Sequence, residues 1–393
     1  MSAVPVTVPE SENKTGSPGS PWLGWTVRER TLYAKGSEPG KYNEVKLEAL
    51  RDRLKLLEER QEPADIIAPL AELHVEFLNS KMQAHFTTTS GRNSKDFFVS
   101  ETGAQQMARE VLPTRFFTGL KELASIDGKG SEIATAAWNK FGSLQRSNRK
   151  VRLVNMNLGD FGVRRVIRSC HSASYAPYSN LEFVQDLLDH AGELADLPIV
   201  SAIVTDSILR LRFAVLDQSD RLALLVGQDP LAYRPVQMIE AWNSEVGLRK
   251  VILRAGLWRP ICTNSVCHWS DKHEYSWIHR GKSARIKTGV SDAFVNLTTS
   301  ANEVVTAYLK AKSVEIGDVG DWLAKKLGEN GVSERVIGAA KLAVTDPSTT
   351  EGTTLATGID AITFAARSEE LIAQDDLERL AAQLLHAGLK EAE

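Results

Sequence analysis

The stretch EAWNSEVGLRKVILRAGLWRPICTNSVCHWSDKHEYSWIHRGKSARIKT, from Glu240 to Thr288, contains the residues that decide how the chain folds. It holds two of the three cysteines, three histidines and two segments rich in β-branched and aromatic residues, which favour strands. After these segments a turn is indicated at Cys262-Thr263-Asn264, and we expect a loop with His268, His273 and His279 to follow it. We therefore expect strands here and interpret the rest of the chain as a scaffold around them.

Strand patterns continue upstream of this stretch. Lys150–Met156 and Gly162–Ser169 are β-branched, Arg-rich runs on either side of a turn that contains Gly159, which predicts a hairpin. Five more β-prone runs lie at residues 198–204, 207–216, 221–226, 235–243 and 247–257. Because short turns separate neighbouring runs, we expect a single, mostly antiparallel sheet of roughly six to eight strands with helices on one face.

Helical periodicity lies on both sides of the strands. Leucines recur at spacings of three and four in residues 43–61, and a second helix is expected at residues 64–82. Shorter helices should follow capping residues, the first of which is Ser100. After Val290, further helices are expected at residues 301–312, 319–327, 333–343, 353–367 and 374–389.

These patterns predict an α+β fold with four parts. Residues 1–20 are rich in Ser, Pro, Gly and Glu and should form a disordered arm. A helical N-terminal part (21–148), a β-rich core domain (149–290) and a helical C-terminal part (291–393) are expected to follow. With 393 residues the chain is long enough to bury a large core.

Composition and charge restrict the classes of function. No apolar run approaches the ~20 residues that span a bilayer and no leader pattern is seen, so we expect a cytoplasmic protein without a membrane partner. Three cysteines indicate a reducing compartment. Residues 140–300 hold 21 Lys and Arg against 15 Asp and Glu, whereas residues 301–393 hold 9 against 16. The basic middle favours a polyanionic partner, although a solvated surface would have the same composition.

Cationic and aromatic side chains of the middle third are candidates for a nucleic-acid surface. Side chains alternate between the faces of a strand, so Arg164 and Arg168 share one face and Arg165 lies on the other. Cations bind phosphates and exposed rings stack on bases, although rings in a β-rich region are also common core residues. The candidate nucleic-acid-binding residues are Arg164, Arg165, Arg168, Arg210, Arg212, Trp269, Tyr275, Trp277, Arg280, Lys282, Arg285 and Lys287.

Standard metal, phosphate-binding and catalytic motifs are not found in the sequence. The spacing Cys-x4-Cys-His-x4-His-x5-His, from Cys262 to His279, fits none of the common zinc patterns. A Gly-Lys-Ser triplet begins at Gly281, but Ser276 stands where a phosphate-binding loop requires its first glycine. A nucleophile elbow is also missing. We therefore expect no metal and no cofactor, and we assign no catalytic residue.

A polar cluster of unknown role completes the candidate residues: Asn243, Ser244, Glu245, Asn264 and His279. One interpretation is a buried hydrogen-bond network that joins strand ends, because buried amides and carboxylates need hydrogen-bond partners. The other interpretation is an active site.

Some of these residues also carry a family resemblance. The run NSEVG (Asn243–Gly247), the segment WRPICTN (Trp258–Asn264) and the later HRG (His279–Gly281) resemble the phage and plasmid family called domain of unknown function 932, which is YfjQ/YafZ-like. Weaker similarity extends over residues 98–367. The resemblance implies a mobile genetic element as the setting and supplies no activity.

Three functions are compatible with the sequence. The leading hypothesis is a non-enzymatic DNA-metabolism protein of a phage or mobile element that binds single-stranded DNA. We expect it to be a homo-oligomer that anneals strands in recombination, with phage or host DNA-repair proteins as partners. One alternative is a protein-interaction or host-takeover factor that docks through its leucine helix and acidic C-terminal part. The other is an enzyme that uses Asn243, Glu245 and Asn264.

Overall fold

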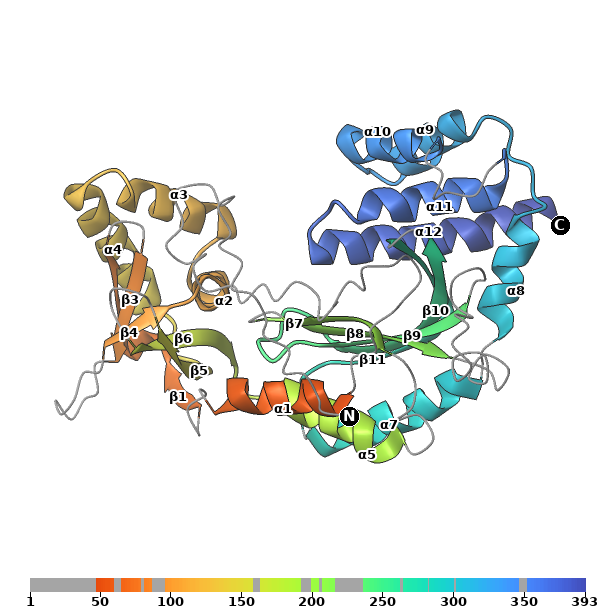
Figure 1. The fold of residues 1–393 in the computed structure, drawn as a ribbon. Coiled ribbons are helices and arrows are strands. Elements are labelled where there is room, and N and C mark those ends of the chain that lie inside the picture. The colour runs from red at the N-terminus through yellow and green to blue at the C-terminus, as the bar shows by residue number, and fades with distance from the viewer. Residues whose placement is uncertain are drawn as a thin grey trace, which may run out of the picture. The chain divides into compact units, whose positions relative to one another are not determined.

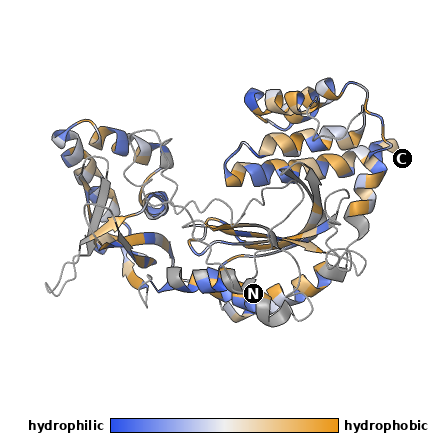
Figure 2. Ribbon diagram, in the orientation of Figure 1, coloured by the Kyte–Doolittle hydropathy of each residue, from blue (hydrophilic) through white to orange (hydrophobic). Residues whose placement is uncertain are grey.

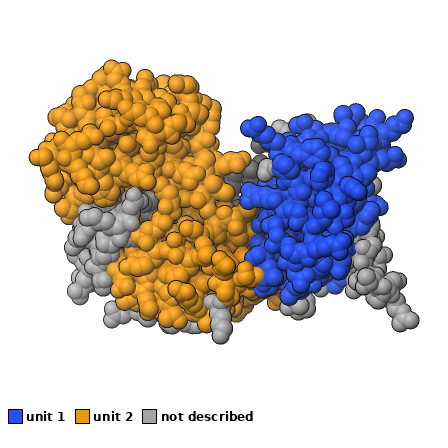
Figure 3. All heavy atoms as spheres, turned by 180° about the vertical axis from the view of Figure 1, so that it is seen from behind, with its two compact units in different colours: residues 1–27, 60–173 blue, residues 28–59, 174–393 orange. Residues whose placement is uncertain are grey.

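The computed structural model describes residues 47–59, 65–78, 81–86, 96–157, 163–191, 199–204, 207–215, 236–261, 264–281, 283–299, 302–345 and 352–393. These residues belong to two compact units (Figure 3). Unit 1 holds those from 65 to 173, and unit 2 holds residues 47–59 and those from 174 to 393. The chain divides inside the range 149–290, which the sequence predicts as one domain. The expected arm at residues 1–20 lies outside the described residues.

The predicted α+β class is confirmed, and the sheets are mostly antiparallel. The expectation of one sheet is wrong. Unit 1 contains a six-stranded sheet and unit 2 contains a five-stranded sheet. Period-two patterns identify strands, but they do not say which strands pair, and this is why the sequence suggested one continuous sheet.

The described part of unit 1 begins with strands rather than helices. In chain order its elements are β1 (Ile66–Pro69), η2 (Leu70–Glu72), β2 (Leu73–Leu78), β3 (Lys81–Phe86), β4 (Asp96–Val99), α2 (Glu101–Val111), α3 (Thr114–Ala124), α4 (Gly128–Gly142), β5 (Asn148–Asn157) and β6 (Val163–Ser172). The sheet order is β1-β5-β6-β4-β3-β2, with β4 and β6 parallel and the other neighbours antiparallel. The predicted hairpin is confirmed as β5 and β6.

The helix expected at residues 64–82 is wrong, because strands β1 and β2 occupy this range. In β2, Leu73, Val75 and Phe77 are buried, whereas His74 and Glu76 between them are partly exposed. This alternation has the period of two that a half-buried strand requires.

Helices α2, α3 and α4 cover one face of the unit 1 sheet. Their buried side chains, among them Met107 and Trp138, pack in one apolar core with side chains of the strands. Ser100 caps α2 as predicted, because its hydroxyl accepts a hydrogen bond from the Gly103 amide at 3.0 Å. A Cβ atom at Gly103 would lie 2.7 Å from the Ile167 carbonyl oxygen, so glycine permits this close contact between α2 and β6.

Side chains of α4 also protect the edge strand β2. Asn139 accepts a hydrogen bond from the Val75 amide at 2.9 Å and donates one to the Val75 carbonyl at 2.8 Å. Thr135 accepts a hydrogen bond from the Phe77 amide at 3.0 Å. These side chains occupy positions where a further strand would pair, and they shield the edge from other chains.

Unit 2 is built around the second sheet. Its elements are α1 (Leu47–Glu58), α5 (Asn180–Ala191), β7 (Ile199–Val204), β8 (Leu209–Val215), β9 (Val236–Asn243), β10 (Val251–Ile261), β11 (Asn264–Trp277), α7 (Ser283–Thr299), α8 (Asn302–Ala311), α9 (Val319–Glu329), α10 (Glu334–Ala343), α11 (Leu355–Ala366) and α12 (Leu371–Ala392). The sheet order is β11-β10-β9-β8-β7, and all neighbours are antiparallel. The predicted C-terminal helices are confirmed as α8 to α12. The strand expected at residues 221–226 lies outside the described residues.

Helices cover both faces of this sheet (Figure 1), so the prediction of helices on one face is wrong. On one face, α1, α5 and α7 pack against alternate strand residues such as Leu211, Ile239 and Leu253 in an apolar core. On the other face lies α12, which contacts charged residues of the strands. The two faces of one sheet therefore differ in chemistry.

The C-terminal helices α8 to α12 share a separate apolar core that includes Leu323, Ala340 and Ile359. In Figure 2 these helices show polar and apolar residues in turn, as amphipathic helices around a common core do. Within the described part of the chain, no helix combines the length and the apolar character that crossing a bilayer requires.

Candidate functional site

A row of alternating charges crosses the unit 2 sheet on the face next to α12. In the strand register, Arg212 of β8 and Arg254 of β10 both lie opposite Glu240 of β9. Arg254 also lies opposite Glu274 of β11. Residues opposite each other on antiparallel strands project from the same face at short distance. The row therefore has the order plus, minus, plus, minus over four strands.

Glu240 is the centre of this row. Its Oε1 accepts hydrogen bonds from Arg210 Nε at 2.5 Å and Arg212 Nε at 2.8 Å, and its Oε2 accepts one from Arg254 Nε at 2.8 Å. All four side chains are buried. One carboxylate thus contacts three guanidinium groups in an environment from which water is excluded.

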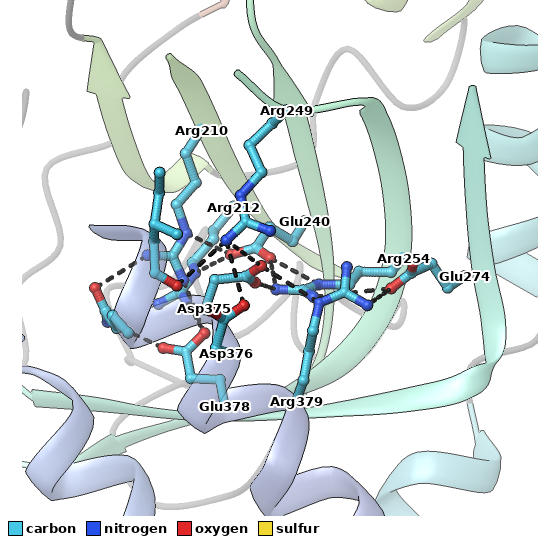
Figure 4. Close-up of polar contacts among 12 residues, drawn as sticks. Arg210, Arg212, Glu240, Arg249, Arg254, Glu274, Asp375, Asp376, Glu378 and Arg379 are labelled. Atoms are coloured by element: carbon cyan, nitrogen blue, oxygen red, sulfur yellow. Dashed lines mark hydrogen bonds and ion pairs between the residues drawn. The ribbon is translucent and has the colours of Figure 1, made fainter. Parts of the chain in front are cut away.

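Helix α12 supplies the remaining charges (Figure 4). Asp375, Glu378 and Arg379 are three and four residues apart and so lie on one helix face. Glu378 accepts hydrogen bonds from Arg210 at 2.8 Å and Arg212 at 2.6 Å, and Asp375 accepts one from Arg254. Arg379 forms an ion pair of 2.8 Å with Glu274, where the row ends.

The fully buried part of this network is balanced in charge. Three arginines (Arg210, Arg212 and Arg254) face three carboxylates (Glu240, Asp375 and Glu378). Burial alone would raise the pKa of Glu240, but Arg254 and Arg212 reverse this effect and hold the pKa below its ordinary value. A carboxylate that stays ionised among arginines is a poor proton donor or acceptor near neutral pH. The network therefore has the character of a structural clamp between α12 and the sheet.

The expectation that Arg210 and Arg212 line an exposed cationic surface is wrong. Side-chain alternation places both arginines of β8 on one face of the sheet, but this face is covered by a helix that carries carboxylates. The candidate residues predicted from the sequence did not include Glu240, Arg254, Asp375 and Glu378. A usable signal was present, because the acidic residues of α12 share the spacing of one helix face.

The arginines of β6 belong to unit 1 and have different environments. Arg164 is exposed, Arg165 is partly buried and Arg168 is buried. In unit 2, Arg280 and Arg285 are exposed. Lys282 lies outside the described residues.

Lys287 of α7 has acidic partners rather than an open surface. It forms an ion pair of 3.2 Å with Glu182 of α5 and lies 4.0 Å from Asp186. Its ammonium group also lies 6.0 Å from the ring centroid of Tyr178, a cation–π arrangement.

Two of the aromatic candidates contribute to the core. Tyr275 and Trp277 of β11 stack with ring centroids 6.4 Å apart and pack against the apolar core beneath the sheet. A Cβ atom at Gly289 of α7 would lie 2.5 Å from Trp277 Nε1, so α7 lies directly on this ring. The backbone of Trp269 belongs to β11, and its side chain lies outside the described residues.

The polar cluster lies at the end of β9, where the chain leaves the sheet. Asn243 donates hydrogen bonds to the Tyr178 carbonyl and to Asn180 Oδ1, both at 3.0 Å. Glu245 accepts one from the Asn180 amide at 2.5 Å. Asn180 is the first residue of α5, so Glu245 places a negative charge at the N-terminus of this helix, where it is favourable.

His279 and Ser244 extend the same cluster. His279 stacks on the Tyr175 ring with centroids 5.2 Å apart, and its Nδ1 lies 3.3 Å from the Ala176 carbonyl oxygen. The Tyr175 hydroxyl donates to the Glu245 carbonyl at 3.1 Å. Ser244 donates to the Ser207 carbonyl at 2.7 Å. These bonds join β9, the start of α5 and the segment after β11, which is the geometry of the buried-network interpretation.

Asn264 does not belong to this cluster. It is the first residue of β11 and pairs with Ile261, whereas the last residue, Trp277, pairs with Val251, and these two positions of β10 are about 33 Å apart. The hairpin of β10 and β11 therefore places Asn264 at the opposite end of the sheet from Asn243. The prediction that Asn264 belongs to this cluster is wrong, because it did not take into account the direction of the strands.

The described residues give little support for nucleophilic catalysis or for a metal site. Burial raises the pKa of Cys170 to about 12, so its thiol is neutral near pH 7. Burial and a hydrogen bond to Asp186 likewise raise the pKa of Tyr178. Among the residues that the structure describes, no three His, Cys, Asp or Glu side chains are grouped to hold a metal ion. The side chains of Cys262, Cys267, His268 and His273 lie outside this set.

Comparisons with known proteins found no relative. No family model, no curated protein and no solved structure matches the chain. The resemblance to the domain of unknown function 932 family therefore stays a prediction from the residues.

Proposed function

We propose that the protein binds single-stranded nucleic acid through basic side chains of unit 1. One observation carries this proposal: residues 133–173 hold eight Lys and Arg and a single acidic residue, Asp160. They include α4 from Ile133 onward and the β5–β6 hairpin, so the cations belong to one part of one unit. A local excess of positive charge attracts the phosphate backbone.

Two of these cations form ion pairs with acidic residues of unit 1. Arg149 pairs with Glu110, and Arg152 pairs with Asp65 at 3.1 Å. Arg146 and Arg164 are exposed, at the approach to β5 and at the start of β6. The positive electrostatic field of these two arginines attracts phosphates without a base-specific contact. We therefore expect little preference for nucleotide sequence.

The proposal includes a phage or plasmid origin of the protein and a role in strand annealing. A phage or plasmid protein that anneals strands in recombination would act as a homo-oligomer beside phage or host DNA-repair proteins.

The two alternative functions have less support from the geometry of the structure. Leu50 and Leu54 of α1 are buried in the core of unit 2, and acidic residues of α12 are engaged inside it. For the enzyme alternative, Asn243 and Glu245 are engaged in backbone hydrogen bonds.

A salt series of fluorescence anisotropy titrations with a labelled single-stranded oligonucleotide tests this function. We expect binding at low salt and a linear fall of log K with log salt concentration. Arg146→Glu and Arg164→Glu should each weaken binding, and each lost phosphate contact should reduce the slope by about 0.7.

Lys341→Glu is the matched control, because it makes the same change in net charge on an exposed residue of unit 2. Binding that is absent at low salt, insensitive to salt, or equally weakened by all three variants would contradict the proposal.

A further inference from the structure

Unit 1 interrupts the chain of unit 2. Helix α1 precedes unit 1 in the sequence and α5 follows it, yet both helices belong to unit 2. Leu50 and Leu54 of α1 pack with Phe183 and Leu187 of α5 in one apolar core. The chain therefore leaves unit 2 after α1, builds unit 1, and returns as α5 to pack against α1.

The two ends of unit 1 lie close together. Val151 of β5 pairs with Ile66 of β1 on one side and with Cys170 of β6 on the other. Ile66 and Cys170 are therefore two strand spacings apart, which is about 10 Å. Ile66 lies at the entry to unit 1 and Cys170 lies just before its exit. A domain whose ends are neighbours can be inserted into another domain without disturbing the fold of that domain.

Unit 1 also supplies its own stabilising contacts. The apolar core beneath α2, α3 and α4 consists of residues 66–170, and the six-stranded sheet consists of residues 66–172. The buried ionic network around Glu240 joins residues of unit 2 alone. A segment of this length with a core of its own is large enough to fold and unfold as one cooperative unit.

We propose that unit 1 is a guest module, which unfolds and refolds cooperatively while unit 2 stays folded, and that nucleic acid binds only the folded module. The second part rests on the proposed function, since the basic segment 133–173 lies within unit 1. A ligand that binds only the folded form of a module raises the fraction of that form. Binding therefore controls the order of unit 1 and leaves unit 2 unchanged.

Unit 2 keeps its own contacts when unit 1 unfolds. Helix α1 is then joined to α5 by a flexible loop, and the entropy of closing a loop rises only slowly with its length. Leu50 and Leu54 are 1 % and 3 % exposed, so burial of apolar surface holds α1 in the core of unit 2.

Differential scanning calorimetry of the full chain tests the modular part. We expect two unfolding transitions, or one peak that a variant of either unit splits in two. Arg212→Met should lower the unit 2 transition by about 5 °C or more and leave the other in place. Asn139→Ala should lower the unit 1 transition alone, and Ser100→Ala, which removes a helix cap, should lower the same transition by a smaller amount. A single transition that all three variants shift as a whole would overturn the proposal.

The same scans in the presence of oligo(dT) test the second part. At about 100 times its Kd, oligo(dT) should raise the transition that Asn139→Ala lowers by roughly 5 °C or more, without moving the unit 2 transition. Arg146→Glu should reduce this rise, whereas Lys341→Glu should not. An equal rise of both transitions would refute the confinement of binding to unit 1. Two transitions that oligo(dT) does not move would contradict the proposed function, whereas the modular part would stand.

Discussion

The start of β6 and strand β8 have similar sequences and different environments. β6 contains Val163-Arg164-Arg165-Val166 and β8 contains Leu209-Arg210-Leu211-Arg212, so both have two arginines among apolar residues. Arg164 of β6 is exposed, whereas Arg210 and Arg212 of β8 are buried and paired with Glu240 and Glu378. The difference arises from the covering helix, because α12 brings carboxylates onto the polar face of β8.

The comparison shows what an arginine-rich strand does and does not indicate. Alternation identifies the face on which a guanidinium lies, since side chains of a strand point alternately to the two sides. Whether this face meets water or a helix depends on distant parts of the chain. The hydrogen bond from Arg212 to Glu378 joins residues 166 positions apart.

The largest difference between the two strands should appear in stability. Arg212→Met leaves Glu240 and Glu378 buried with less compensation, and we expect a loss of about 3–5 kcal/mol in the free energy of unfolding. Arg164→Met, which removes an exposed side chain, should change it by less than about 0.5 kcal/mol. Urea unfolding followed by circular dichroism measures both. Similar values for the two variants would remove the distinction between the strands.

The next comparison concerns the uncharged hydrogen bonds between α4 and β2, in contrast to the ionic contacts of α12. Asn139→Ala removes the side chain that pairs with the Val75 backbone at the edge of β2. We expect a loss of about 1–3 kcal/mol, because the Val75 amide and carbonyl would lack these partners. The loss should not depend on pH between 4 and 8, unlike that of an ionic contact. A pH-dependent effect of Asn139→Ala, or none at all, would contradict this view.

Acid should weaken the ionic attachment selectively. The folded pKa of Glu240 lies below its ordinary value of 4.5, so the unfolded chain takes up the proton first. Its contribution to stability is fully present above pH 4.5 and is lost as the pH falls below this value toward the folded pKa. Unfolding titrations should show this fall in the wild type. Glu240→Gln should be less stable at neutral pH and should lack this component; an identical pH profile would oppose the assignment.

The smallest effect is expected for a cation at the surface of unit 2. Lys287 and Glu182 form an ion pair whose side chains are 35 % and 45 % exposed. Lys287→Met should cost no more than about 1 kcal/mol, and salt should reduce the effect further. A loss comparable with that of Arg212→Met would show that burial does not separate the two classes of ion pair.

Local features of the fold were predictable from the sequence. The C-terminal helices have leucine and alanine at helical spacings, and Ser100 precedes a helix that it caps. Residues 64–82 were mistaken for a helix because Leu, Ala and Glu are good helix formers, although Leu73, Val75 and Phe77 alternate as a strand does. Here the alternation of buried side chains in the sheet outweighed the helix propensity of the individual residues.

The candidate site was predicted less well, for a geometric reason. The NSEVG segment and His279 do meet, through Tyr175 and the start of α5. Asn264 lies at the other end of the sheet, and the partners of Arg210 and Arg212 come from α12. The direction of the strands decides the position of Asn264, and the placement of α12 decides the partners of the two arginines. A single short segment of sequence encodes neither the strand direction nor the helix placement.

The late position of α12 has a consequence for synthesis on the ribosome. Arg254 emerges 121 residues before Asp375, so until α12 has been translated Glu240 is the one carboxylate of the buried network that accompanies the three arginines of the nascent sheet. Folding of unit 2 should therefore wait until α12 has been translated. Pulse proteolysis of stalled nascent chains should find unit 2 resistant only once α12 has left the exit tunnel.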